Sequence, residues 1–545
     1  MIDLTVEAHS AVVEPGLSLF ECAERLGLSV TNSCLRQGIC RECIVEVIAG
    51  GELLTQPTSH ERHLRGDFRL ACQAVIQAPR GRIAFRRLRR SDVRVLDAGR
   101  GLPDTWQDAP LDPAVTREAG HVLLEGKPVA RSAAPLYGLA LDIGTTTVVV
   151  RLIDLESGRV AATQSFENPQ CFAGSDIMSR IAAFATDSER RLQRTLTAYI
   201  NQAIRRFPCD PTTIYEVVVA GNSTMRDLFF GLDIQSLGQS PYRSITELER
   251  EDGLREGTSM LAPVRQLGLE AHPQARVYGL PLIGSHVGAD TTACLLAIDA
   301  PNEERLIALM DIGTNTEIVI GNRHGMLAAS CPAGPAFEGG TITCGLPAFP
   351  GAIERVRLAD SNGVDFEVIG GGRPQGICGS GLVDVLGELL RLERMNRLGR
   401  IGAERFVLDS GAHIYVTEAD IGRLAQAKAA NAAGWALITR AYGTAYSELE
   451  QLFLAGGFAN HLDTEAAARI GLIPPLPPDR VQPIGNAAIE GATLALRSMT
   501  LRRTIEAFVS TIRHFELETD AGFFDAFVEG CQFKPLEADR RGLAE

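Results

Sequence analysis

Four cysteines near the N-terminus are spaced like the ligands of a metal site. Cys34, Cys40 and Cys43 share the loop "SCLRQGICREC", and Cys72 completes the spacing C-x5-C-x2-C-x28-C. Four thiolates can enclose zinc or a [2Fe-2S] cluster. Structural zinc sites usually draw on two separate Cys-x2-Cys pairs or on histidine, whereas three of these cysteines share one loop. The spacing therefore favours an iron-sulfur cluster, with zinc and a chance grouping as the alternatives.

Two copies of one turn are suited to hold magnesium and phosphate. "LALDIGTTTVVV" (139–150) recurs as "ALMDIGTNTEIV" (308–319), with the shared core D-I-G-T-x-T. A strand that turns back at this core places a carboxylate beside free N–H groups and hydroxyls. We expect Asp142 and Asp311 to contact magnesium directly or through water. The residues expected at the phosphates are Gly144, Thr145, Thr146, Gly313, Thr314 and Asn315. One such turn by itself is more often an ordinary hairpin turn.

Two further pairs of segments repeat in the same order. "VVVAGNSTM" (217–225) is echoed by "LFLAGGFAN" (452–460), and "PLIGSHVGADTTACL" (281–295) by "QPIGNAAIEGATLAL" (482–496). Matched pairs in one order indicate two halves of a duplicated fold. At Gly456 and Gly457 the missing side chains would let a nucleoside lie against the backbone. Asn460 could bind the nucleoside or cap the following helix.

Several other polar residues have both a chemical and a structural interpretation. Glu338 in "PAFEGG" and Asp176 in "AGSDIMSR" could orient the attacking water, or deprotonate a hydroxyl in a kinase. A turn carboxylate or a helix cap is the commoner role of such residues. Of the two, Glu338 is our catalytic candidate. Asp290 could equally be structural, and Lys428 is a candidate nucleotide contact within a helix expected after Thr417.

The N-terminal elements that would position the cysteines can be read from the pattern. "IDLTVEAHSAVVEP" alternates apolar and polar residues and predicts a hairpin, and "LSLFECAERLGL" predicts a helix capped by Ser18. "IVEVIAGG" predicts a strand after the loop, and "RLACQAVI" a last strand that carries Cys72. Between 91 and 135 periodicity is lost apart from the strand pair "HVLLEGKPVA", which indicates a linker.

The composition limits the class of protein. A chain of 545 residues is too long for one core, and its net charge of -14 disfavours nucleic acid or an anionic membrane as partner. The start of the chain has no secretory signal, and no segment approaches the about 20 apolar residues that span a membrane, so we expect a soluble cytoplasmic protein. The basic run "RGRIAFRRLRR" could dock an acidic partner or simply be solvated.

Both halves of the chain resemble known folds. The first 90 or so residues resemble [2Fe-2S] ferredoxins of the β-grasp fold, and the x5 spacing is like that of the adrenal type, which implies Cys34, Cys40, Cys43 and Cys72 as cluster ligands. The region from about Leu136 resembles the superfamily of acetate and sugar kinases, heat-shock chaperones and actin. That resemblance implies two ribonuclease-H-like lobes that close on ATP. We therefore expect an α+β multidomain protein with a ferredoxin-like domain (1–90), a linker (91–135) and an actin-like ATPase (136–545).

The fusion of these two parts resembles the reductive activators of corrinoid-dependent enzymes. "NPQCFAGSDIMSRI", "CPAGPAFEGGTI", "GICGSGLVDVL" and "LAGGFANHLD" match that family as well. The resemblance implies that the protein uses ATP and Mg²⁺ to transfer one electron from a [2Fe-2S] cluster to the Co(II) corrinoid protein of a methyltransferase system. It also implies a flavodoxin, ferredoxin or reductase as electron donor, and a homodimer.

Three other interpretations of the same residues stay open. The protein could be an ATP-gated electron donor to another low-potential enzyme, such as a radical dehydratase. It could be a small-molecule kinase with a fused redox domain, because the fold alone does not define the reaction. It could also be a chaperone-like module that holds a cobalt protein while another protein reduces it.

Overall fold

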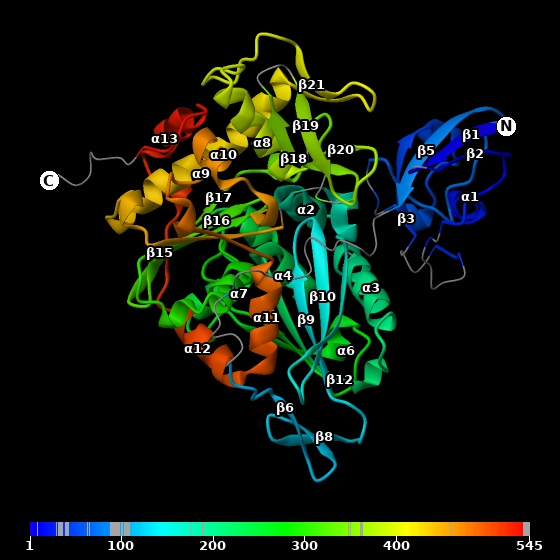
Figure 1. Cartoon of the computed structure of the whole chain (residues 1–545). Coiled ribbons are helices and arrows are strands. Elements are labelled where there is room, and N and C mark those ends of the chain that lie inside the picture. Colours follow the sequence, from blue (N-terminus) through cyan, green and yellow to red (C-terminus); the bar gives the residue numbers. More distant parts are fainter. Residues whose placement is uncertain are drawn as a thin grey trace.

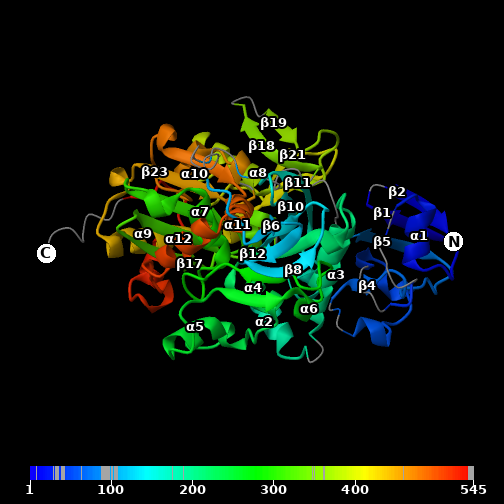
Figure 2. The ribbon, with the colours of Figure 1, turned by 90° about the horizontal axis from the view of Figure 1, so that it is seen from below.

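The computed structural model describes residues 1–7, 9–28, 30, 36–38, 43–62, 64, 66–87, 99, 102, 109–174, 176–187, 190–339, 341–346, 348, 350–359, 363–457 and 459–537. Figure 1 shows a small N-terminal domain beside a larger body of two lobes. In the view from below, the same domain again lies next to α3 (Arg191–Arg205) of the first lobe (Figure 2). The chain thus has the expected α+β multidomain architecture.

The N-terminal domain is a β-grasp domain. Its described strands form one sheet in the order β2-β1-β5-β3-β4, in which β1 and β5 are parallel. The strands are β1 (Ile2–Val6), β2 (His9–Val13), β3 (Ile44–Ala49), β4 (Phe68–Leu70) and β5 (Gly81–Arg87). Helix α1 (Leu19–Arg25) begins after Ser18, whose hydroxyl accepts a hydrogen bond from the backbone N–H of Glu21. The predicted hairpin, helix and third strand are confirmed.

The strand predicted to carry Cys72 is wrong. β4 ends at Leu70, and Ala71 to Gln73 form a turn in which the backbone N–H of Ala71 still donates to the carbonyl of Cys43. The last strand of this sheet along the chain is β5, which lies within the arginine run and at the centre of the sheet. The turn frees the Cys72 side chain from the alternation that a strand imposes, so that it can face the loop cysteines.

The region between the two main parts contains a small sheet of its own. Strands β6 (Val115–Glu118), β7 (His121–Leu124) and β8 (Lys127–Arg131) form an antiparallel meander that projects below the first lobe in Figure 1. The strand pair expected in "HVLLEGKPVA" is therefore confirmed as β7 and β8. The division of the chain at residues 90 and 135 stays a prediction.

The first lobe is built on a mixed sheet in the order β11-β10-β9-β12-β14-β13. β9, β10 and β11 form an antiparallel meander, and β12 and β14 continue the sheet in parallel with β9. All eight residues of β12 are buried, as expected for a strand covered on both faces. The strands are β9 (Tyr137–Ile143), β10 (Thr147–Asp154), β11 (Val160–Glu167), β12 (Ile214–Gly221), β13 (Met260–Pro263) and β14 (Arg276–Gly279).

The second lobe repeats this topology. Its sheet has the order β24-β23-β15-β16-β17-β25, with an antiparallel meander of β15, β16 and β17 and with β23 and β24 added in parallel. The strands are β15 (Ile307–Ile312), β16 (Thr316–Asn322), β17 (Gly325–Cys331), β23 (Gln451–Ala455), β24 (Val481–Gly485) and β25 (Arg513–His514). The duplication inferred from the repeated segments is therefore confirmed.

The third repeated pair forms the helices between the two sheets. α7 (Ala289–Ala297) and α11 (Ala487–Arg497) pack on each other and share one hydrophobic core with strands of both lobes. A Cβ atom on Gly491 of α11 would lie 1.8 Å from the carbonyl oxygen of Ala293 in α7. Only glycine permits this close crossing. The two halves of the duplication thus join through equivalent helices.

The other helices surround the two sheets, and an additional subdomain covers part of the second lobe. In the first lobe these helices are α2 (Ile177–Phe184), α4 (Ser223–Phe230), α5 (Ile245–Glu251) and α6 (Val264–Leu267). In the second they are α8 (Gly379–Arg391), α9 (Glu418–Tyr442), α10 (Thr464–Ile470), α12 (Met499–Val509) and α13 (Phe523–Gly530). The remaining described strands are β18 (Ala352–Leu358), β19 (Val364–Val368), β20 (Gly376–Ile377), β21 (Arg405–Asp409) and β22 (Ile414–Thr417).

Candidate functional site

The two repeated turns face each other across one cleft between the lobes. Gly144, Thr145 and Thr146 line it from the β9–β10 hairpin, and Gly313, Thr314 and Asn315 line it from the β15–β16 hairpin. The cleft has an empty volume of about 1100 Å³, including its open mouth. That is enough for a small-molecule ligand.

Glu338 connects the two turns. It ends the short helical turn at Pro335–Glu338, and its carboxylate accepts hydrogen bonds from the hydroxyls of Thr146, at 3.1 Å, and Thr314. These hydroxyls come from different lobes, so Glu338 occupies the point where the lobes meet. Burial raises the pKa of its carboxyl group.

Several more carboxylates lie in the cleft. Asp142 and Asp311 end equivalent strands, and Asp290, from the first turn of α7, and Glu317, directly opposite Asp311 in the β15–β16 ladder, join them. Burial raises the pKa of Asp142 to about 7 and, with the charges of Asp290 and Asp142, that of Asp311 to about 8. Such groups hold protons unless a cation compensates their charge.

These residues fit a magnesium ion that is only partly held by protein. Carboxylate oxygens are the ligands that Mg²⁺ prefers, and it usually binds one or two of them together with phosphates and water. Among the described residues, no three His, Cys, Asp or Glu side chains are close enough together to hold a metal ion by themselves. The cleft therefore offers part of a coordination shell, which a nucleotide would complete.

Sequence reasoning missed several residues of this site. Asn222 donates from its side-chain amide to the hydroxyl of Thr145 at 3.0 Å, and Asn486 donates to the carboxylate of Asp142 at 2.8 Å. Asn222 caps α4 and Asn486 caps α11. Both residues belong to the repeated segments, as does Asp290. Their position directly after a buried strand was the signal that could have identified them.

The glycine segment of the second lobe is only partly at the cleft. Gly456 and Gly457 line it, as predicted. Gly456 has φ 104°, and a Cβ atom there would lie 2.3 Å from the carbonyl oxygen of Ile312, so the backbone crosses closely under the second turn. Asn460 lies against Gly485 and is not among the described residues that line the cleft, so the structure does not place it at the predicted nucleoside site.

Two other residues have structural surroundings instead of chemical ones. Asp176 caps α2 through a 2.8 Å hydrogen bond from the backbone N–H of Ser179. Lys428 is 1% exposed and donates to the carbonyl of Gln532 at 2.5 Å, beside the ring of Phe533. It does not line the cleft, so the predicted nucleotide contact is wrong. Helix α9, which carries Lys428, buries this side chain against Gln532 and Phe533.

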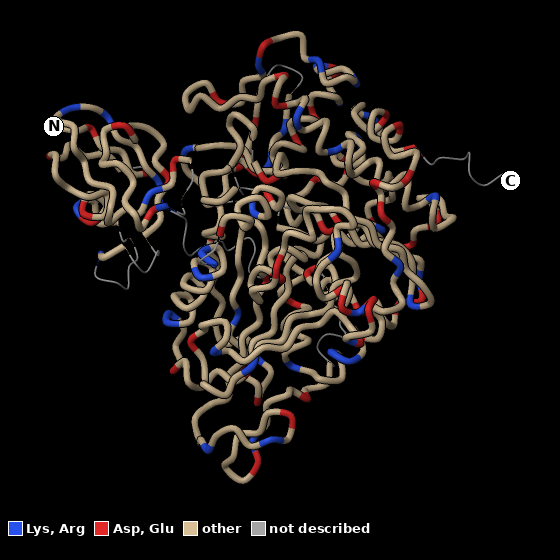
Figure 3. The backbone as a smooth tube through the Cα atoms, turned by 180° about the vertical axis from the view of Figure 1, so that it is seen from behind, with Lys and Arg blue, Asp and Glu red and all other residues tan. Residues whose placement is uncertain are grey.

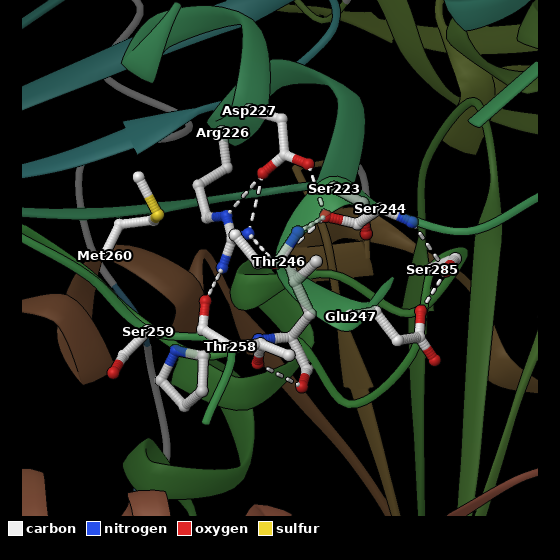
Figure 4. A network of polar contacts seen from close by, with 12 residues as sticks. Ser223, Arg226, Asp227, Ser244, Thr246, Glu247, Thr258, Ser259, Met260 and Ser285 are labelled. Atoms are coloured by element: carbon white, nitrogen blue, oxygen red, sulfur yellow. Dashed lines mark hydrogen bonds and ion pairs between the residues drawn. The ribbon is translucent and has the colours of Figure 1, made fainter. Parts of the chain in front are cut away.

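A buried polar network lies within the first lobe (Figure 4). The guanidinium of Arg226 in α4 donates to the carboxylate of Asp227 at 2.7 Å and to the carbonyl of Thr258 at 2.7 Å. Asp227 also accepts from the hydroxyl of Ser244, the N-cap of α5, at 2.6 Å. Since α4 begins at the Asn222 cap, this network holds the helix that supports Thr145.

The described part of the cysteine site fits an iron-sulfur cluster. The Sγ atoms of Cys43 and Cys72 are 3.4 Å apart, and neither residue is in a disulfide. Two thiolates on one tetrahedral metal with bonds of about 2.3 Å would be about 3.8 Å apart. A hydrogen bond from Cys43 lowers the pKa of Cys72 to about 6, which favours the thiolate that metals bind. Cys34 and Cys40 lie outside the described residues.

No described helix is both long and apolar enough to traverse a lipid bilayer.

The fold and the two sites define a class of protein: an actin-like ATPase that carries a ferredoxin-like domain.

Comparisons with known proteins identify the family. Profiles described as "2Fe-2S iron-sulfur cluster binding domain", "RACo middle region" and "C-terminal domain of RACo the ASKHA domain" match residues 4–77, 137–302 and 305–541. The "Corrinoid activation enzyme RamQ" of Eubacterium limosum is 33% identical over 448 residues, which cover 76% of this chain and 73% of RamQ. The chain therefore belongs to the RACo family of corrinoid activation proteins.

Two other relatives agree with this membership. The "[Co(II) methylated amine-specific corrinoid protein] reductase" of Methanosarcina barkeri is 25% identical over 413 residues, covering 71% of this chain and 75% of that protein. The solved structure of a "Reductive activator for corrinoid, iron-sulfur protein" superposes with a TM-score of 0.71 at 26% identity, covering 98% of this chain and 99% of the other. The resemblance of the whole chain to this family is thus confirmed.

Proposed function

We propose that the protein is an ATP-dependent reductive activator that returns an inactive Co(II) corrinoid protein of a methyltransferase system to Co(I). The observation that carries this proposal is that one chain of the RACo family contains both a pair of adjacent cysteines and a cleft lined by the two repeated turns. A small-molecule kinase requires a nucleotide cleft but no cysteine site. A simple ferredoxin requires a cysteine site but no nucleotide cleft.

All but one of the predicted site residues have a role in this proposal. Cys34, Cys40, Cys43 and Cys72 hold the [2Fe-2S] cluster, which when bound supplies one electron at a time. Asp142 and Asp311 face the magnesium ion of MgATP. Glu338, between the two threonine hydroxyls, positions the attacking water. The residues that contact the nucleotide are Gly144, Thr145, Thr146, Gly313, Thr314, Asn315, Gly456 and Gly457. Asn460 is left out, because it lies against Gly485 and is not among the described residues of the cleft lining.

The need for ATP follows from the energy of the electron transfer. Clusters of this type have reduction potentials of about -400 mV. For every ~59 mV by which the potential of the acceptor lies below that of the cluster, the transfer of one electron costs about 1.4 kcal/mol. A nucleotide can drive such a step only if it binds two states of the complex with different affinity. The two lobes supply the two states, because their separation changes the distance between the turns that hold the phosphates.

The partners follow from the same reaction. The acceptor is the corrinoid protein, and the electron enters from a flavodoxin, a ferredoxin or a reductase. The protein acts as a homodimer, by analogy with its family. Its location in the cytoplasm remains a prediction from the sequence.

The test is a reduction assay under anaerobic conditions. The reduced protein is mixed with a Co(II) corrinoid protein, with and without MgATP, and the visible spectrum is recorded. We expect the Co(I) spectrum only when MgATP is present. A Cys40→Ala variant that still binds ATP should give no Co(I). Co(I) formation by that variant would favour the chaperone-like interpretation, and Co(I) formation without ATP would contradict the proposal.

A further inference from the structure

The N-terminal domain contacts the first lobe through one bidentate ion pair. The guanidinium of Arg86, near the end of β5, donates to both carboxylate oxygens of Glu167, at 3.0 and 3.2 Å, and Glu167 is the last residue of β11. Arg86 also pairs with Glu46 of its own domain. The Glu167 side chain is only 10% exposed. In Figure 3, backbone segments of both basic (blue) and acidic (red) residues lie where the N-terminal domain meets the larger body. The arginine run thus contains a contact inside the molecule.

The N-terminal domain and the first lobe also line a common crevice. Arg62 of the N-terminal domain lines a crevice together with residues of the first lobe. The lobe residues are Phe172, Ala173, Ala183, Thr186, Asp187, Arg191 and Leu192. Phe172 and Ala173 belong to the helical turn that follows Glu167 directly. The N-terminal domain therefore rests on the segment that begins at Glu167.

The same segment holds the first phosphate turn in place. Glu167 lies opposite Thr147 in the β10–β11 ladder. The next residue, Asn168, is fully buried, and its backbone N–H donates to the carbonyl of Thr146 at 2.7 Å. The Asn168 side-chain amide donates to the carbonyl of Gly144 at 2.8 Å. Asn168, the residue next to Glu167, is therefore bonded to the turn through both its backbone and its side chain.

A buried arginine strengthens this connection. Arg180 of α2 is 1% exposed, and its guanidinium donates to the carbonyls of Thr145, at 2.5 Å, and Gly174, at 3.2 Å. Gly174 ends the helical turn on which the N-terminal domain rests. Arg180 thus connects the phosphate turn to the helical turn that follows Glu167.

We propose that Arg86 and Glu167 are positioning residues that dock the ferredoxin-like domain on the first lobe, and that this docking is coupled to nucleotide binding in the cleft. The proposal deepens the proposed function, on which it rests. Phosphates bound at Gly144 to Thr146 change the position of the turn, and the turn is bonded to the segment that carries Glu167. The nucleotide thereby sets where the electron carrier stands.

Thermodynamic linkage makes the proposal quantitative. If nucleotide changes the docking equilibrium by some factor, docking must change the nucleotide affinity by the same factor. A partly buried bidentate pair at the junction makes a factor of about two- to tenfold reasonable. An ordinary surface ion pair would have no effect on the nucleotide at all.

The experiment compares three variants of the cluster-loaded, oxidised protein. Glu167→Gln and Arg86→Gln break the docking pair. Arg87→Gln is the matched control, because Arg87 pairs with Glu7 inside the N-terminal domain at 3.0 Å. Titration calorimetry measures the dissociation constant of a magnesium-bound, non-hydrolysable ATP analogue, and small-angle scattering measures the separation of the domains. The visible spectrum of the cluster verifies that each variant is folded.

We expect nucleotide to change the scattering of the unmodified protein and of Arg87→Gln. The two docking variants should show the same scattering with and without nucleotide, and their dissociation constants should shift by about two- to tenfold in the same direction. The proposal would be overturned if both docking variants kept the dissociation constant of the unmodified protein. It would also be overturned if nucleotide did not change the scattering of the unmodified protein. Because no corrinoid protein is present, a failed Co(I) assay and a failed docking test are distinct results.

Discussion

Asp311 shows how one carboxylate acquires a role from its surroundings. It ends a buried strand, faces Asp142 from the other lobe across the cleft, and lies opposite Glu317 in its own hairpin. An isolated aspartate at a strand end would be an ordinary turn residue. Here it belongs to a group of carboxylates, three half-buried and one buried, whose charge a cation or protons can compensate.

Replacing Asp311 with Asn tests its role in hydrolysis. The amide keeps the shape but loses the charge that faces magnesium, so we expect ATP hydrolysis to fall by about 10²–10³-fold. Phosphate release measures the rate. Asp210→Asn is the control, because Asp210 only caps a short helical turn at Pro211–Thr213. Hydrolysis at the normal rate by the Asp311 variant would remove this residue from the site.

The raised pKa values predict that nucleotide binding depends on pH. Burial raises the pKa of Asp142 to about 7 and that of Asp311 to about 8, so both groups hold protons that magnesium must displace. The affinity for MgATP should therefore rise between about pH 6 and pH 8. Titration calorimetry at several pH values measures it.

The same shifts determine how the stability of the nucleotide-free protein changes with pH. At Asp142 and Asp311 the folded state binds more protons than the unfolded state above the ordinary aspartate pKa of about 3.9, so these two groups stabilise it most at low pH. Its stability should therefore decrease as the pH rises from about 4 towards 8, and MgATP should restore more at the upper end. Asp290→Asn should move both profiles to lower pH, because the Asp290 charge raises the pKa of Asp311. Flat profiles would contradict the assignment.

At the scale of elements, the crossing of α7 and α11 is the part of the fold that joins the two halves. Gly491→Ala would place a methyl group 1.8 Å from the carbonyl oxygen of Ala293, so the helices would have to separate. We expect a loss of about 1–3 kcal/mol or more in the free energy of unfolding, measured by denaturant titration.

Gly422 in α9 provides the matched control for this substitution. It is also a helical glycine, but a Cβ atom there meets nothing within 4 Å. Gly422→Ala should leave the stability unchanged or raise it by up to about 1 kcal/mol. If Gly491→Ala changes the free energy of unfolding as little as Gly422→Ala does, the close crossing of α7 and α11 is contradicted.

At the scale of the whole molecule, the cysteine site lies in the N-terminal domain, whereas the cleft lies between the two lobes of the larger body. Cys72→Ser should abolish cluster binding, because the turn after β4 brings Cys72 within 3.4 Å of Cys43. Iron analysis and electron paramagnetic resonance measure the loss. Nucleotide binding should persist, since the cleft lies between the two lobes of the larger body and not in the N-terminal domain. Cys209→Ser is the control and should keep the cluster; a Cys72 variant with full iron content would exclude Cys72 as a ligand.

Most of the architecture and part of the site could be predicted from the sequence. The hairpins at Asp142 and Asp311 are local structures, in which neighbouring residues decide the turn. Their repetition in the same order as two other segments is enough to indicate the duplication. The pattern of "RLACQAVI" predicts a strand at Cys72, but the backbone turns at Ala71, which the local sequence does not indicate.

The composition of the site, by contrast, depends on contacts between distant segments. Asp290 and Asn486 reach the cleft because α7 and α11 pack between the two sheets, and Glu167 meets Arg86 across 81 residues of sequence. The sequence by itself determined the local turns, the repeats and the cysteine spacing, because these are set by residues that are near each other in the chain. Only the tertiary structure decided which carboxylates converge and where the N-terminal domain docks, because long-range packing sets both.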